Sequence, residues 1–117
     1  MTYAKDKQWI EWNQAAKLIK LAGFELADPR SFEMDDATPR ETIEADCNAI
    51  DTCHGILVLG DSPSWGAAQE LFYAWSKEKI CAVKCNADPR SRWMEGHAHC
   101  VENTLIAAIQ FLKDTIK

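Results

Sequence analysis

The residues best suited to chemistry follow a short apolar run at residues 55–59. Asp61 stands two positions after this run, Ser64 follows three positions later, and Glu70 six positions after Ser64. Because an α-helix rises about 1.5 Å per residue, six positions span roughly 9 Å along its axis. The start of a helix after a buried strand commonly binds anions, since its N–H groups point at the ligand. A phosphate held near Ser64 would therefore bring the rest of a nucleotide-sized ligand near Glu70.

A second carboxylate, that of Asp46, is expected on the core-facing stripe of the preceding helix. Residues 38–53 begin with Thr-Pro-Arg-Glu, which combines a capping threonine, an early proline and the glutamate of a capping box. Asp46 stands three residues after Ile43 and four before Ile50, so the three side chains share one side. A carboxylate on such a stripe needs a partner or a function. Each residue also has an alternative without a catalytic role. Asp46 can be a carboxylate at the edge of the core-facing stripe, and Glu70 can be an ordinary solvated glutamate of a helix.

The cysteines and histidines do not form a recognisable metal site. Cys81 and Cys85 fall in one expected strand, where four residues separate them by roughly 13 Å, too far to chelate one ion. No Cys-x-x-Cys pair occurs. Residues 86–100 carry two arginines, a tryptophan and two histidines. Three interpretations of this loop are possible. Its arginines and tryptophan can bind a phosphate and stack on a base, the loop can be solvated, or it can form a subunit contact.

Alternating helical and strand patterns position these residues. Helices are expected at residues 6–22, 38–53, 64–79 and from about 102, and strands at 24–27, 55–59 and 80–85. This alternation predicts a parallel sheet with helices on both faces. Only residues 1–4 precede the first helix, so the N-terminal strand is short or missing. The sequence thus predicts a single α/β domain over residues 1–117, flavodoxin- or Rossmann-like, with three α/β/α layers.

Composition and charge exclude several classes of function. The net charge of −5 leaves no basic surface for duplex nucleic acid. No apolar run approaches a membrane span, and no signal-peptide pattern opens the chain. Five cysteines without an export signal indicate reduced thiols in a cytoplasmic protein. Five tryptophans are many for 117 residues, and we expect them to cover a pocket, line a subunit interface or fill the core.

The turn and helix after residues 55–59 resemble the nucleoside 2-deoxyribosyltransferase superfamily, which includes the 2′-deoxynucleoside 5′-monophosphate N-glycosidases. The Ser-x-Gly-x-x-x-Glu signature of these proteins stands here as Ser64-Trp65-Gly66-Ala67-Ala68-Gln69-Glu70. Asp46, 18 residues before Ser64, matches their helix aspartate. Tyr3 matches a tyrosine near the start of their first strand. The relatives follow that strand with a glycine-containing turn, whereas here no glycine comes before Gly23.

The resemblance implies a role for each matching residue. Glu70 would act at the anomeric carbon of the sugar, as a nucleophile or as the stabiliser of an oxocarbenium-like state. Asp46 would be the second carboxylate. The Ser64 hydroxyl and the Gly66 N–H would hold a 5′-phosphate or 5′-hydroxyl. The further candidates for substrate contact are Asp61, Trp65 and Tyr3.

Together these features favour an enzyme that hydrolyses or transfers the N-glycosidic bond of a (deoxy)nucleoside or its 5′-monophosphate. The resemblance implies a small-molecule substrate, no metal or organic cofactor, and a homodimer or higher homo-oligomer, because relatives complete their pockets across subunits. Two alternatives stay open. One is a non-catalytic nucleotide-binding module, and the other is an oligomeric interaction subunit with a degenerate pocket.

Overall fold

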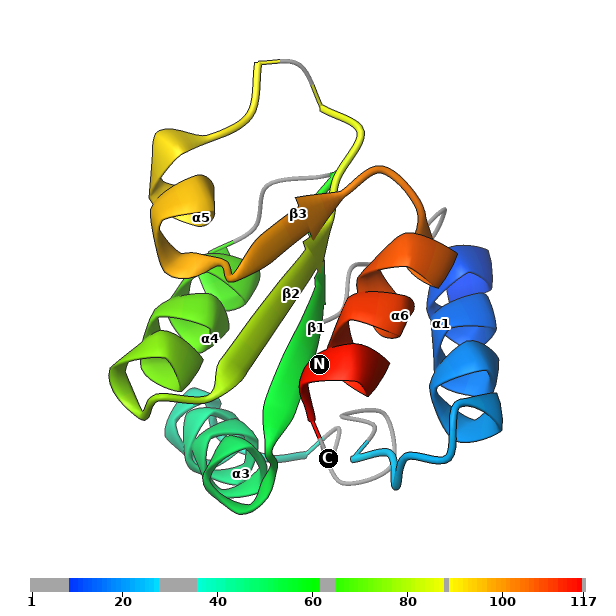
Figure 1. Cartoon of the computed structure of the whole chain (residues 1–117). Coiled ribbons are helices and arrows are strands. Elements are labelled where there is room, and N and C mark those ends of the chain that lie inside the picture. The colour runs from blue at the N-terminus through cyan, green and yellow to red at the C-terminus, as the bar shows by residue number, and fades with distance from the viewer. Residues whose placement is uncertain (1–8, 28–35, 62–64, 88, 117) are drawn as a thin grey trace.

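The computed structural model describes residues 9–27, 36–61, 65–87 and 89–116 (Figure 1). The helices are α1 (Trp9–Leu21), α3 (Pro39–Thr52), α4 (Trp65–Ser76), α5 (Arg92–His97) and α6 (Leu105–Thr115). The strands are β1 (Gly55–Leu59), β2 (Ile80–Lys84) and β3 (Cys100–Glu102). Within the described ranges, every helix is too short or too polar to cross a lipid bilayer.

The described strands form one parallel sheet in the order β1-β2-β3. Gly55 pairs with Ile80 at one end of β1, and Leu59 pairs with Lys84 at the other. Helix α4 connects β1 to β2, and α5 connects β2 to β3. Parallel neighbours need such crossovers because the chain must return to the same edge before each new strand. The predicted parallel α/β sheet is therefore confirmed.

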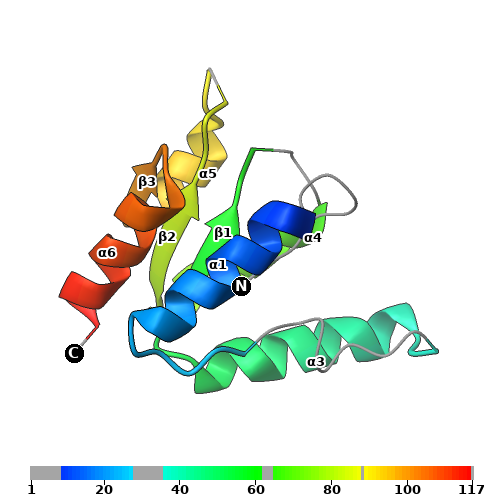
Figure 2. The same ribbon diagram turned by 90° about the vertical axis from the view of Figure 1, so that its right-hand side faces the viewer.

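Two helical layers cover the sheet, one on each face. Successive side chains of a strand point to opposite faces, so Leu57 and Leu59 join the core cluster of α1 and α6, whereas Ile56 and Val58 join that of α3 and α4. Figure 1 shows α1 and α6 on one side of the sheet and α3, α4 and α5 on the other. Figure 2 looks from the side of α1 and α6. The three-layer, flavodoxin- or Rossmann-like architecture is confirmed.

The capping box predicted at the start of residues 38–53 is present. The Glu41 N–H donates to Thr38 Oγ1 (3.2 Å), and the Thr38 N–H donates to Glu41 Oε1 (3.1 Å). These two bonds satisfy N–H groups that a helix start leaves without a partner. Ile50 of α3 is buried as expected, but Ile43 is 62% exposed. The prediction that Ile43 faces the core is wrong, because α3 contacts α4 through its C-terminal half.

Two other expectations about local structure need correction. Residues 24–27 are not a strand: the Phe24 N–H donates to the Ile19 carbonyl (3.3 Å) and so closes the end of α1. Phe24 and Leu26 instead pack against the core between α1 and α6. Residues 92–102, expected mainly as a loop, contain α5 and β3. The expected first strand at residues 1–4 lies outside the described residues.

Candidate active site

The candidate site lies where β1 ends and α4 begins, at the carboxyl edge of the sheet. Gly66 is in the first turn of α4, is exposed, and has open space where a Cβ atom would stand. Trp65, the first residue of α4, is 89% exposed. Ser64 and Tyr3 lie outside the described residues, so their expected contacts stay predictions. The described part of this corner therefore offers an accessible helix start with an uncrowded glycine.

The two expected carboxylates come from facing helices. Asp46 lies in α3 and Glu70 in the second turn of α4, and these helices pack against each other. Both residues are partly buried. One oxygen of each, Asp46 Oδ1 and Glu70 Oε2, is shielded from solvent. Neither side chain is therefore a fully solvated helix acid, which was the alternative for Glu70.

The thiol of Cys47 shows how charge is distributed where α3 meets α4. Burial raises the pKa of the Cys47 thiol, and the carboxylates of Asp46, Asp51 and Glu70 raise it further, with only Lys77 opposing them. The Cys47 thiol therefore lies in an acidic environment to which Asp46, Asp51 and Glu70 contribute.

A second set of contacts fixes α4 against α3. The Tyr73 hydroxyl donates to Asp51 Oδ1 (2.7 Å), and Lys79 Nζ donates to the Asp51 carbonyl oxygen (3.1 Å). The hydrogen bond to Asp51 raises the pKa of Tyr73 to about 12. Tyr73 follows Glu70 by one helical turn. The bond from Tyr73 to Asp51 consequently helps to set which side of α4 faces α3.

Lys84 was not singled out as a site residue from the sequence, yet it organises the carboxyl edge of the sheet. Its side chain is only 8% exposed, and its Nζ lies 2.6 Å from Glu11 Oε2 and 2.5 Å from Asp61 Oδ2. Glu11 is in the first turn of α1. This triad joins β2, α1 and the turn after β1. The sequence did contain one indication of this role, because Lys84 is a single charged residue directly after the apolar residues 80–83.

Asp61, expected to contact substrate, is held on both carboxylate oxygens. Oδ2 accepts from Lys84 Nζ, and Oδ1 accepts from the Asn86 backbone N–H at 2.5 Å. Burial acts to raise the pKa of Asp61, but the hydrogen bonds from Lys84 and Asn86 outweigh it, so the pKa lies below its ordinary value. In this structure Asp61 fixes the chain where it leaves β1.

The candidate residues of the segment after β2 have partners of their own. Arg90 Nη2 donates to Asn103 Oδ1 (2.7 Å). Trp93 and His97 are on α5 and contact aromatic rings of α4. All five cysteines are free thiols. Among the described residues, no three histidine, cysteine, aspartate or glutamate side chains are grouped as a metal site would require.

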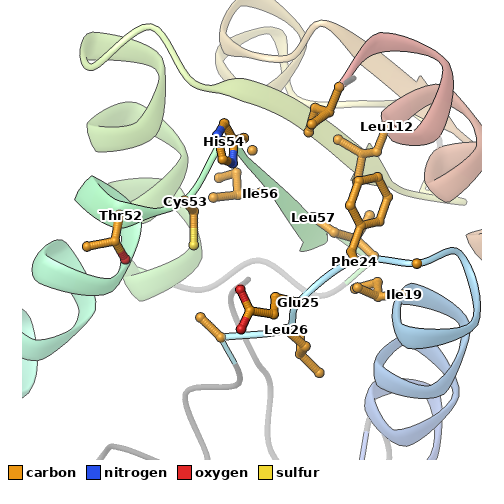
Figure 3. A pocket seen from close by; sticks show the side chains of 14 residues that line it. Ile19, Phe24, Glu25, Leu26, Thr52, Cys53, His54, Ile56, Leu57 and Leu112 are labelled. Atoms are coloured by element: carbon orange, nitrogen blue, oxygen red, sulfur yellow. The ribbon is translucent and has the colours of Figure 1, made fainter.

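A cavity of about 530 Å³ lies at the amino end of β1. Its lining is mostly apolar and also includes Glu25, Cys53 and His54. Figure 3 shows Phe24 and Leu112 on one side of it and Cys53 on the other. Neither Asp46 nor Glu70 lines this cavity. It is therefore a separate feature from the site at the carboxyl edge.

These elements define a three-layer α/β fold with a parallel sheet, in which Asp46 and Glu70 are partly buried on two helices that pack against each other. No protein-family model matches the sequence, and no curated protein matches it. Among solved structures, the chain is similar to the CMP N-glycosidase BcmB of Clostridium botulinum, with a TM-score of 0.68 at 18% sequence identity. The match covers 94% of this chain and 93% of that protein. At this identity the likeness establishes a shared fold.

Proposed function

We propose that the chain cleaves the N-glycosidic bond of a nucleoside 5′-monophosphate or nucleoside, with water or an acceptor base completing the reaction. One observation carries the proposal. Asp46 of α3 and Glu70 of α4 lie on helices that pack against each other, and each has one carboxylate oxygen shielded from solvent. Paired carboxylates are the usual means of breaking a glycosidic bond. The fold shared with a CMP N-glycosidase supports a nucleotide as the substrate class.

In this proposal Glu70 acts at C1′ of the sugar. Its carboxylate forms a bond to C1′, or stabilises positive charge there, while the bond from C1′ to the base breaks. Asp46 supplies the proton that the departing base needs. Water or an acceptor base then attacks C1′, any bond between C1′ and Glu70 breaks, and the proton that the attacking group loses returns to the Asp46 carboxylate. No step in this sequence requires a metal or an organic cofactor.

The start of α4 anchors the other end of the substrate. Helix N-termini favour anions because unpaired N–H groups and the helix dipole point at them. Gly66 leaves the backbone there accessible, and Ser64 adds a hydroxyl. Asp61, Trp65 and Tyr3 remain proposed substrate contacts. The rise from this anchor to Glu70, roughly 9 Å, suits the distance from a 5′-phosphate to the anomeric carbon. The resemblance also implies a homodimer or higher homo-oligomer, which stays a proposal.

Release of free base is the test. The protein is incubated with CMP, dCMP, dAMP, dGMP and the corresponding nucleosides, and free base is measured by chromatography. We expect release from at least one of these compounds, and Glu70→Gln should slow it by at least about 100-fold. Glu44→Gln is the matched control, because Glu44 is an exposed glutamate of α3.

Two results would contradict the proposal. The first is nucleotide binding by the unaltered protein without base release, which favours a binding module. The second is an unchanged rate in Glu70→Gln. The absence of a glycine between Tyr3 and Gly23, where related enzymes have a glycine turn, is the observation that keeps the binding module as second candidate.

A further inference from the structure

The cavity at the amino end of β1 lies beside a free edge of the sheet. Strand β1 pairs with β2 on one side, and no described strand pairs with its other side. Gly55, Ile56 and Leu57 of β1 line the cavity together with residues 23–27, which belong to no strand. Leu57 and Leu112 of this lining belong to the core cluster of α1 and α6, and Ile56 belongs to that of α3 and α4. Residues from both faces of the sheet therefore meet at this edge.

Two residues of this edge direct their backbone hydrogen-bonding groups away from β2. The His54 carbonyl accepts from the Ile80 N–H (3.2 Å), so His54 faces β2. These groups alternate between the two sides of a strand, so the N–H and C=O groups of Gly55 and Leu57 face the free side. Among the described residues, none bonds to these groups. Leu57 is buried, and a buried backbone group without a partner costs free energy, which favours a ligand that pairs with it.

The part of the edge that borders the cavity has the length of a small molecule. Val58 and Leu59, the second half of β1, do not line the cavity. Residues two apart in a strand are separated by about 6.6 Å, which is the reach between the free groups of Gly55 and Leu57. A strand added by another protein would pair with the rest of the edge as well. The cavity volume of about 530 Å³ lies within the range of about 300–1,000 Å³ for small-molecule sites.

The lining of the cavity is unfavourable to anions. Most of its side chains are apolar, and its one carboxylate is that of Glu25. Its remaining ionisable side chains are those of Cys53 and His54, and none of its residues is a lysine or an arginine. Figure 3 shows the Glu25 carboxylate turned toward the side of the cavity where Cys53 lies. A phosphate or carboxylate bound there would meet the like charge of Glu25 without a lysine or arginine to offset it.

We propose that this cavity binds a small, neutral, mostly apolar molecule that carries an amide or a similar pair of donor and acceptor groups. The apolar part lies against Phe24 and Leu112, and the amide pairs with the free backbone groups of Gly55 and Leu57. Glu25 disfavours molecules that carry a negative charge. Ligand sites commonly combine a mostly apolar lining with a few polar groups that fix the orientation of the ligand.

This second site is independent of the proposed base release. Neither Asp46 nor Glu70 lines the cavity, and a nucleotide carries the negative charge that the lining disfavours. Failure of a neutral molecule to bind in the cavity would leave the proposed base release unaffected. Failure of base release would equally leave the proposal for the cavity intact, because its test uses no nucleotide.

Indole-3-acetamide and indole-3-acetate test the proposal, because they share one shape and differ in an amide against a carboxylate. Each compound is titrated to about 10 mM into the isotope-labelled full chain at pH 7 and followed by NMR. We expect indole-3-acetamide to shift the Gly55 and Leu57 N–H signals saturably, and indole-3-acetate to bind at least about tenfold more weakly. Glu25→Gln should reduce this difference at least about threefold, whereas Glu44→Gln, at an exposed position of α3, should preserve it.

Ala27→Trp provides a variant that fills the cavity, since Ala27 is half-buried in its lining. It should abolish the shifts caused by indole-3-acetamide, whereas Ile106→Trp, at an exposed position of α6, should preserve them. The NMR spectrum shows whether each variant is folded, and Glu25→Gln alters an exposed residue, so it tests the site even if Ala27→Trp misfolds. Absence of saturable shifts at Gly55 and Leu57 would overturn the proposal. Equal affinity for the two compounds, or unchanged binding in folded Ala27→Trp, would also overturn it.

Discussion

At the scale of single residues, Asp46 and Glu70 show why the sequence pointed to a site. Each stands among small or apolar neighbours on a helix, which allows another helix to approach closely. Each has one oxygen shielded from solvent where α3 meets α4. Spacing alone was an incomplete guide to the side on which Asp46 lies, because Ile50 of the same expected stripe is buried whereas Ile43 is 62% exposed.

Lys84 gives the clearest stability prediction at this scale. Lys84→Met would leave Glu11 and Asp61 without the ammonium group that both contact. Removal of one member of a largely buried ion pair leaves charge uncompensated, so we expect the free energy of unfolding to fall by about 2–3 kcal/mol. Urea unfolding at pH 7 measures this. Lys17→Met, at an exposed position of α1, should change it by less than about 0.5 kcal/mol; equal losses in the two variants would contradict the role assigned to Lys84.

The hydrogen bonds to Asp61 also predict a dependence of stability on pH. Its pKa lies below the ordinary value of 3.8, so the folded state favours the ionised form. The resulting stabilisation is fully present above about pH 4 and is lost as the pH falls through the lowered pKa. We therefore expect Asp61→Asn to be less stable than the unaltered protein at pH 7, with the difference shrinking toward pH 3. Urea unfolding at both pH values measures it, and a constant difference would contradict the prediction.

At the scale of elements, the periodicity of apolar residues predicted the type and position of the longer helices and strands. Helices α1, α3 and α4 and strands β1 and β2 lie within a few residues of their expected positions. Strand β3 was missed because its three half-buried residues are too short for an alternating pattern. Residues 24–27 alternate like a strand but lie beside α1 instead. Whether such a short segment forms a strand depends on tertiary contacts, which the local sequence does not reveal.

The contact between Lys84 and Glu11 illustrates the same limit within the site. The two residues are 73 positions apart, and only the assembled sheet brings the end of β2 to the first turn of α1. The capping box at Thr38, by contrast, is complete within four residues and was predicted correctly. Local hydrogen bonds are readable from spacing, whereas distant ion pairs are not.

The close approach of β1, β2 and α6 at Gly55 predicts a packing defect on substitution. A Cβ atom at this position would lie 2.7 Å from Ile116 Cδ1 and 2.8 Å from the Ile80 carbonyl oxygen. The backbone oxygen cannot move without shifting β2, so Gly55→Ala should lower the unfolding free energy by about 1–3 kcal/mol. Thermal and urea unfolding measure the change.

Gly96→Ala is the matched control for this prediction. A Cβ atom at Gly96, in α5, would meet nothing within 4 Å, and alanine favours a helix over glycine. We expect Gly96→Ala to be neutral or slightly stabilising. Equal stability of Gly55→Ala and Gly96→Ala would contradict the close approach of neighbouring atoms at Gly55.

At the scale of the whole molecule, the two edges of the sheet have different characters. The carboxyl edge carries the Lys84 triad and the start of α4. The amino edge carries the cavity of about 530 Å³, whose lining is mostly apolar. In open α/β sheets, ligands usually bind outside the carboxyl ends of the strands. We therefore expect the nucleotide to bind at the carboxyl edge.

A crystal structure of Glu70→Gln with CMP or the best substrate tests this central claim most directly, because the variant should bind nucleotide without consuming it. We predict that the phosphate lies at the first turn of α4 and that C1′ lies within about 3.5 Å of the side chain at position 70. A nucleotide bound in the cavity at the amino edge, or with its sugar remote from position 70, would contradict the account.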